Sequence, residues 1–204
     1  MRNLRKLALI GLGVVCLLAA IAVGAWFYLV STVEQPKFAL VAQEGAVELR
    51  DYPGLVVAEV TRRGDRMSAV RAGFSPLAGY IFAKNRDGET VSMTAPVTQT
   101  PIEPGDQSWV VRFVMPAKYT LATLPKAAGD DVRLVELPAA RRAAIRFSGV
   151  ATDALIAENE AALRTWLAAR GEAILGPATY AYYNDPFTPG PLRRNEVMFE
   201  LAKR

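Results

Sequence analysis

Histidine, the side chain that most often performs acid–base chemistry near neutral pH, does not occur in this chain of 204 residues. Its absence excludes nucleophilic triads with a histidine base and zinc sites built on imidazole. Glu196 and Glu200 share one side of an expected strand, but a solvated strand face explains them better than a pair of catalytic carboxylates. We therefore predict no catalytic residue, no metal site and no enzymatic activity.

A stripe of apolar residues with a neighbouring arginine is the best candidate for binding chemistry. The apolar side chains recur at three- and four-residue spacing, which is typical of one helix face: Met67, Val70, Phe74, Leu77 and Ile81. Arg71 lies within one turn of Phe74. Such a stripe usually faces a protein core, and a groove for an apolar ligand is the alternative. Arg71 is correspondingly either a solvated charge or the partner of an acidic group.

A second candidate is the proline-rich segment 184–194, which carries Phe187 and two adjacent arginines. Its composition predicts a loop between two strands. Arg193 and Arg194 either meet an anionic ligand at the mouth of this loop or bond the backbone carbonyl groups that hold its turns. The sequence leaves both alternatives open.

An internal duplication supplies the elements that must position these residues. Residues 47–64 match residues 132–149 at a constant offset of 85 positions, which aligns Pro53 with Pro138 and Gly64 with Gly149. Each copy alternates apolar and polar residues around a proline-centred turn, which predicts two tightly joined strands. A helical stretch and two further strand-like runs follow each copy. The sequence therefore predicts a β-β-α-β-β unit that occurs twice.

The predicted fold class is α+β, with an antiparallel sheet that curls toward a barrel and two helices packed against it. In the first unit we expect strands at 41–50, 55–61, 91–97 and 109–115. The first helix should kink or restart at Pro76, with Ser75 as the cap of the restarted part. In the second unit we expect a helix that begins at Thr152 or Asp153 and final strands at 178–183 and 196–201. Residues 116–131 should form a surface loop between the units.

The run from Leu7 to Val30 is apolar throughout and exceeds the roughly 20 residues that cross a bilayer core. A cleaved signal peptide is the alternative, but its apolar region is usually only about 7 to 15 residues long. We therefore predict an N-terminal transmembrane helix. Residues 1–33 should form this membrane anchor (or uncleaved signal) with its spacer, and residues 34–204 should form the ligand-binding domain.

Basic residues precede the apolar run, so the positive-inside rule predicts a single-pass protein with a cytoplasmic N-terminus and a periplasmic or extracellular domain. These residues also account for three of the four net positive charges. The remainder of the chain is nearly neutral, and we predict no binding to nucleic acid. The sequence does not indicate an oligomeric state.

Five short motifs in the soluble part look familiar: LAGYIF at 77–82, MTAPV at 93–97, FVMP at 113–116, DPF at 185–187 and RRNEV at 193–197. Together they resemble the SOUL haem-binding protein family over roughly residues 46–202. The resemblance implies a distorted eight-stranded antiparallel barrel with two flanking helices and pseudo-twofold halves. It also implies that haem or another tetrapyrrole binds in a hydrophobic groove beside the first helix, with basic side chains near the propionates.

Transferred to this chain, the resemblance matches Arg71 to the arginine of the first helix and Phe74 to the apolar groove position one turn further on. The full set of ligand-binding residues that it implies is Met67, Arg71, Phe74, Leu77, Ala78, Ile81, Phe187 and Arg193. Some family members have a histidine axial ligand, and this chain has no histidine. Haem would therefore be held by apolar contact and propionate pairing, or by weaker ligation from Met67, Met93 or Tyr80.

The resulting prediction is a membrane-anchored tetrapyrrole-binding protein without chemistry of its own. One alternative is a gyrase-inhibitor-like small-molecule binding domain with hydrolase activity, which would need a glutamate in the groove. The apolar face of the first helix carries no glutamate. The other alternative is a module that binds a lipid or a peptide instead of haem.

Overall fold

A computed structural model describes residues 33–202, apart from positions 85, 104 and 106, together with positions 13, 17 and 24. The chain divides into two compact units, Met1–Val33 and Glu34–Arg204, and the second is described below. The predicted span at residues 7–30 lies outside the described residues except for three positions, so it stays a prediction. Within the described part of the chain, no helix combines the length and the hydropathy needed to cross a membrane.

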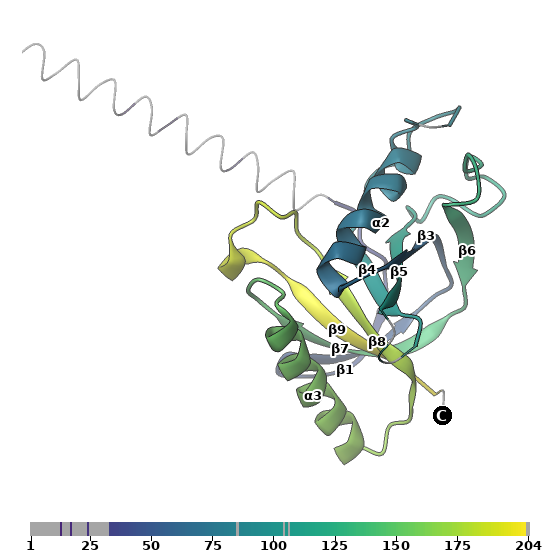
Figure 1. Cartoon of the computed structure of the whole chain (residues 1–204). Helices are drawn as coiled ribbons and strands as arrows, with labels where there is room; N and C mark the ends of the chain where they lie inside the picture. Colours follow the sequence, from purple (N-terminus) through teal and green to yellow (C-terminus); the bar gives the residue numbers. More distant parts are fainter. Residues whose placement is uncertain are drawn as a thin grey trace, which may run out of the picture. The chain divides into compact units, whose positions relative to one another are not determined.

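The second unit has nine strands in one antiparallel sheet and two α-helices, so the predicted α+β class is confirmed (Figure 1). The first half contains β1 (Ala39–Glu44), β2 (Val47–Tyr52), β3 (Leu55–Arg63), α2 (Arg66–Ile81), β4 (Val97–Pro101) and β5 (Ser108–Val114). The second half contains β6 (Arg133–Leu137), β7 (Ala140–Phe147), α3 (Asp153–Ala169), β8 (Ile174–Tyr182), a short 3-10 helix (Gly190–Leu192) and β9 (Asn195–Leu201).

The strand order is β1-β2-β7-β9-β8-β4-β5-β3-β6, and no pairing joins β1 to β6. The expected eight-stranded barrel is therefore wrong in two respects, because the sheet is open and has nine strands. The extra strand arises within residues 41–50, which were expected to form one strand. Gly45 has a φ of 56° there and makes the turn that separates β1 from β2, a conformation that glycine adopts without steric cost.

The strand order confirms the duplication independently of the sequence. Apart from β1, the counterparts in the two halves are β2 and β6, β3 and β7, β4 and β8, and β5 and β9. Replacing each strand by its counterpart gives the same order read from the other end of the sheet. The hydrogen-bonded registers agree as well. Val57 pairs with Val135 and Arg50 pairs with Arg142, and these two pairs are equivalent at the offset of 85. Strand β2 of the first half therefore pairs with β7 of the second half, and β6 of the second half pairs with β3 of the first. Strands β4 and β8 pair at the centre of the sheet.

The strand expected at residues 91–97 begins only at Val97 and continues to Pro101. Pro96 directly precedes it and has no backbone N–H to donate to a ladder, which limits regular pairing to the residues that follow. The other expected strands agree with the structure to within a few residues.

Helix α2 passes through Pro76 without the expected restart. Asp65, rather than Ser75, is the N-cap, and its carboxylate accepts a hydrogen bond from the backbone N–H of Ser68 at 2.8 Å. Pro76 cannot donate to the carbonyl group of Ala72 four residues earlier. The Nε of Arg62 donates to that oxygen at 3.3 Å instead, so a side chain from β3 replaces the missing helical hydrogen bond.

Each helix covers the strands of its own half (Figure 1). Leu77 and Ile81 of α2 pack with Val111 and Phe113 of β5 in one core cluster. A second cluster contains Leu163 and Leu167 of α3 together with residues of β2, β7, β8 and β9. The two separate clusters show that each helix buries its apolar face against half of the shared sheet.

Gly73 allows α2 to approach β5 closely, because an added Cβ would lie 2.8 Å from two atoms of Val111. We expect Gly73→Ala to lower the free energy of unfolding by about 1 kcal/mol. Overpacking costs about 1–3 kcal/mol, and the better helix propensity of alanine recovers about 1 kcal/mol. Urea unfolding of residues 34–204 measures the change. Adding Val111→Ala should make the glycine substitution less harmful, and a Gly73→Ala variant more stable than the parent would contradict the expectation.

Candidate functional site

One flank of α2 presents apolar side chains to solvent. Met67, Arg71, Phe74 and Ala78 follow one another at four-, three- and four-residue spacing, so they share a stripe along the helix. Met67 is 37% exposed and Phe74 is 41% exposed. The ring of Phe74 lies edge-on to the buried ring of Phe113, with centroids 5.2 Å apart. We call these four residues the α2 flank; it combines an apolar surface with one arginine.

The other two residues that the resemblance assigns to this helix lie deeper. Leu77 and Ile81 are 0% and 1% exposed and belong to the core beneath α2. Their burial places them beneath the α2 flank, and their implied role as ligand contacts stays a prediction. They support the flank by fixing the helix on the sheet.

The two arginines of α2 have different environments. Arg66 is buried, and it donates to the carboxylate of Asp153 at 2.7 Å, to the carbonyl oxygen of Ala151 at 2.6 Å and to the hydroxyl of Tyr182 at 2.7 Å. These bonds join the first turn of α2 to the start of α3 and the end of β8. Arg71 is exposed and forms no hydrogen bond or ion pair with any described residue. Arg71 is therefore the α2 arginine that remains available for an acidic ligand.

The corresponding flank of α3 is polar. Leu77 and Ile81 of α2 and Leu163 and Leu167 of α3 are fully buried pairs with the same four-residue spacing. We align the two helices on these pairs, which gives an offset of 86. Phe74 then corresponds to Glu160, whose carboxylate accepts from the hydroxyl of Tyr180 at 2.9 Å and pairs with Arg164 at 2.8 Å. Glu160 is not among the residues predicted from the sequence, because the resemblance places the groove beside the first helix and Glu160 lies on the second. Only the first half therefore offers an apolar helix flank.

The tyrosines are poor candidates for ligating iron. Burial raises the pKa of Tyr180 and of Tyr183, and these hydroxyls donate to Glu160 and Glu196. Burial raises the pKa of Tyr182 too, although Arg66 opposes the shift. Tyr80 is 4% exposed and its hydroxyl donates to the carbonyl oxygen of Pro125 at 2.8 Å. All four tyrosines stay protonated at neutral pH, and Tyr80 lies beneath the surface.

The late loop, residues 184–194, is closed by its own polar groups. The guanidinium of Arg193 donates to the carbonyl oxygens of Thr188 at 2.7 Å and Pro186 at 2.5 Å. This arrangement is the second of the two alternatives for Arg193, and it leaves little of the guanidinium for a ligand. Phe187 is 89% exposed. The positions of Phe187 and Arg193 do not test whether these residues contact the ligand, so both roles stay predictions.

The strongest polar interaction of the domain lies away from both helices. Arg50 and Glu196 form a bidentate pair at 2.7 and 2.9 Å, and both side chains are almost inaccessible to solvent. Arg194 and Tyr183 also donate to Glu196. Burial alone would raise the pKa of Glu196, but the hydrogen bonds and charges of Arg50 and Arg194 outweigh burial and lower it. The pair is fully satisfied and is structural.

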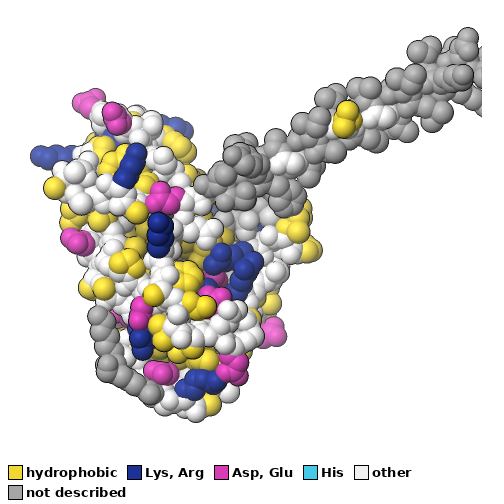
Figure 2. Space-filling view, turned by 180° about the vertical axis from the view of Figure 1, so that it is seen from behind, with side chains coloured by type: hydrophobic (Ala, Val, Ile, Leu, Met, Phe, Trp, Pro, Cys, Tyr) yellow, Lys and Arg dark blue, Asp and Glu magenta, His cyan; other side chains and the backbone are white. Residues whose placement is uncertain are grey.

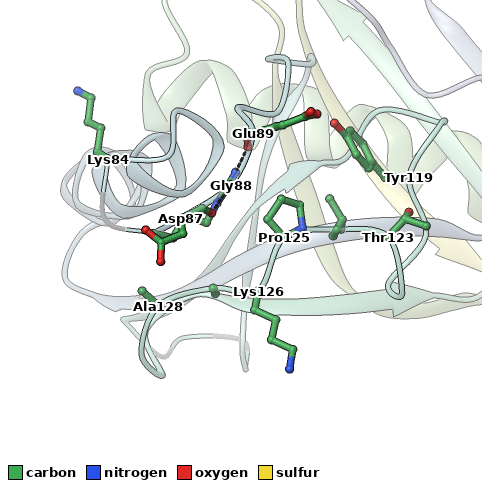
Figure 3. Close-up of a pocket in the computed structure, with 12 residues that line it drawn as sticks. Lys84, Asp87, Gly88, Glu89, Tyr119, Thr123, Pro125, Lys126 and Ala128 are labelled. Carbon is green, nitrogen blue, oxygen red and sulfur yellow. Dashed lines mark hydrogen bonds between the residues drawn. The ribbon is translucent and has the colours of Figure 1, made fainter.

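An open hollow of about 990 Å³ lies between the turn after α2 and the link that precedes β6. It is lined mainly by residues 84–89 and 123–128 and contains none of the residues implied for the ligand. Figure 3 shows the side chains of Lys84 and Lys126 pointing away from each other. The lining also includes Arg86, whose guanidinium donates to the backbone carbonyl oxygens of Tyr80, Asp87 and Glu89.

Charge is mixed over the surface of the second unit. Figure 2 shows basic and acidic side chains next to one another on the face opposite to that of Figure 1. Among the described residues, no group of three or more histidine, cysteine, aspartate or glutamate side chains is placed to hold a metal ion.

Comparison with solved structures shows how widely this fold is used. A protein described as a hydrolase from Listeria innocua is 14% identical, with 79% of this chain and 94% of that chain covered and a TM-score of 0.55. The EcmrR C-terminal domain is also 14% identical, with 78% and 98% covered and a TM-score of 0.60. Identity at this level demonstrates a shared fold and no more.

Comparison at the level of sequence is more specific. Heme-binding protein 2 of Mus musculus is 41% identical over 64 residues, which cover 31% of this chain and 31% of the mouse protein. The family model described as SOUL heme-binding protein matches residues 33–200, nearly the whole second unit. The resemblance seen in the short motifs is thereby confirmed, and the chain belongs to the SOUL heme-binding protein family.

Proposed function

We propose that this protein binds a tetrapyrrole, haem in the first instance, along the α2 flank. The observation that carries the proposal is the combination of exposed Met67 and Phe74 with the unpaired Arg71 on one helix stripe. Membership of the SOUL family supports haem as the ligand. A flat apolar macrocycle gains free energy when its face leaves water, and arginine suits a propionate carboxylate.

The residues of the flank fit a haem that is held without a strong axial ligand. No histidine is available, and the sulfur of Met67 already accepts a hydrogen bond from Arg66 at 3.5 Å. Met93 is only partly exposed and packs against the core. Apolar contact with Met67, Phe74 and Ala78 therefore supplies most of the binding free energy, with Arg71 orienting the propionates.

The second part of the proposal concerns location. We infer that residues 7–30 span a membrane and that the domain lies on its periplasmic or extracellular side. The length of the apolar run and the basic residues before it support this arrangement.

Titration of residues 34–204 with haemin tests the binding proposal. We expect a shift of the Soret band and saturable quenching of tryptophan fluorescence. Arg71→Gln should weaken binding by about two- to fivefold, because an exposed ion pair contributes about 0.4–1 kcal/mol. Arg146→Gln, on β7, is the matched control and should leave the affinity unchanged. Absence of any Soret shift in the parent protein would refute the proposal.

The enzymatic alternative rests on Glu160, on the polar flank of α3, and on Tyr180 of β8, whose hydroxyl donates to it. Both carboxylate oxygens of Glu160 are engaged, one by Arg164 and one by Tyr180. A general base needs a free oxygen within reach of its substrate, so this arrangement favours a structural pair over a catalytic one. Esterase activity that disappears in Glu160→Gln would favour the hydrolase instead.

A further inference from the structure

Two adjoining loops carry large apolar side chains that are exposed to solvent and belong to none of the core clusters. Phe187 is 89% exposed, Val150 is 56% exposed and Leu192 is 53% exposed. The loops touch, since the backbone N–H of Gly149 donates to the carbonyl oxygen of Gly190 at 3.0 Å. A Cβ added at Gly190 would lie 3.5 Å from the side chain of Val150. We call Val150, Phe187 and Leu192 the loop patch.

Internal hydrogen bonds hold the loop patch in this exposed arrangement. The carboxylate of Asp185 accepts bonds from the backbone N–H groups of Phe187 and Thr188 at 2.7 and 3.0 Å. The side-chain oxygen of Asn184 accepts from the backbone N–H of Arg194 at 2.7 Å and closes the base of the loop. Phe187 is therefore presented by a braced turn. An aromatic residue fixed in water in this way indicates an apolar partner.

The start of the described domain lies beside this loop. Gln35 accepts a hydrogen bond from the guanidinium of Arg194 at 3.2 Å, and the carbonyl oxygen of Glu34 accepts from the backbone N–H of Ala95 at 2.9 Å. Only four residue steps separate Glu34 from Val30, where the apolar run ends. An extended chain covers at most about 14 Å in four steps. Any bilayer that holds residues 7–30 must therefore lie close to the base of the late loop.

We propose that the loop patch docks on the lipid surface, with Phe187 and Leu192 entering the interface between headgroups and acyl chains. The inference rests on the membrane anchor proposed above. Phenylalanine and leucine are typical of the apolar faces that peripheral proteins bury at the boundary between headgroups and acyl chains. Arg193 and Arg194 are engaged inside the protein, so apolar insertion and not charge attraction holds the patch, and the contact should persist at high salt.

The experiment uses the full chain in vesicles of phosphatidylcholine and phosphatidylglycerol, with Cys16→Ser as background. An environment-sensitive fluorophore is attached to Leu192→Cys, or to Leu175→Cys as the control. Leu175 is similarly exposed at 49% but lies at the opposite end of β8, about 20 Å along the strand from Tyr182. We expect blue-shifted emission at position 192, quenched by headgroup spin-labelled lipid at low and high salt, and water-like emission at position 175.

The outcomes separate the anchor from the docking surface. Flotation of the chain with vesicles, combined with water-like emission at both positions, would overturn docking and leave the anchor intact. Failure to float would overturn both. Val150→Ser should reduce quenching at position 192 without changing haemin affinity, because Val150 belongs to the loop patch and to none of the implied ligand contacts. If that variant leaves the quenching unchanged, the loop patch does not enter the lipid and the docking surface is refuted.

Discussion

Replacing Glu196 with glutamine should lower the free energy of unfolding of residues 34–204 by about 3–5 kcal/mol, the usual cost of breaking one side of a buried ion pair. The neutral amide leaves the guanidinium of Arg50 buried at 1% exposure with a single remaining carboxylate, Glu48 at 2.7 Å. Arg194 and Tyr183 donate to different oxygens of Glu196, and the amide replaces one of these two acceptors with an NH2 group. Urea unfolding followed by circular dichroism measures the change.

Asp131→Asn is the matched control for this prediction. Asp131 pairs bidentately with Arg62 at 2.6 and 2.7 Å, but its side chain is 56% exposed, so the loss should stay below about 1 kcal/mol.

The pH dependence of the free energy of unfolding offers a second readout of the Glu196 prediction. The folded-state pKa of Glu196 is lowered from 4.5, so its contribution is present above that pH and is lost as the pH falls through the lowered value. The parent should lose more stability in acid than Glu196→Gln does, and equal losses would contradict this account.

Replacing Phe74 with aspartate should reduce haemin affinity by about tenfold to a hundredfold. Burying a phenylalanine side chain is worth about 1.5–3 kcal/mol, and the substitution removes this contact from the centre of the α2 flank. A carboxylate next to Arg71 would also neutralise the cation that is expected to meet the propionates. Haemin titration of residues 34–204, followed by Soret absorbance and tryptophan quenching, measures the change.

Leu175→Asp controls for the effect of an added surface charge on an exposed apolar position, and it should bind haemin like the parent. The fold of Phe74→Asp must be checked as well, because the Phe74 ring contacts Phe113 in the core. Far-ultraviolet circular dichroism and the urea midpoint serve that purpose. A folded Phe74→Asp variant with parental affinity would place the ligand elsewhere on the domain.

The two halves of the domain have the same framework but opposite helix flanks. Phe74 and Ala78 in α2 stand where Glu160 and Arg164 stand in α3, and Glu160 and Arg164 pair with each other. The duplication therefore supplies two equivalent scaffolds, of which one offers apolar surface and an unpaired arginine. We therefore expect haem to bind along α2 alone, with a stoichiometry of one haem per chain.

The sequence alone determined the repeat, the α+β class and the positions of most elements. These features depend on local patterns: alternation in β3 and β7, helical spacing in α2 and α3, and the cap at Thr152, which bonds Leu155 as expected. Local periodicity shows which side of an element is buried. The short motifs added haem as the expected ligand, because the family that they indicated is described as heme-binding.

Only the tertiary structure decided which strands pair and which polar side chains remain available. The exchange of β2 and β6 between the halves, the open edges at β1 and β6, and the pairing of Arg50 with Glu196 join residues that are far apart in the chain. Among the arginines, contacts made after folding engage Arg66 and Arg193 and leave Arg71 without a partner among the described residues. Periodicity identifies a buried face but not the groups that meet it, since those groups come from elements that approach only when the sheet has formed.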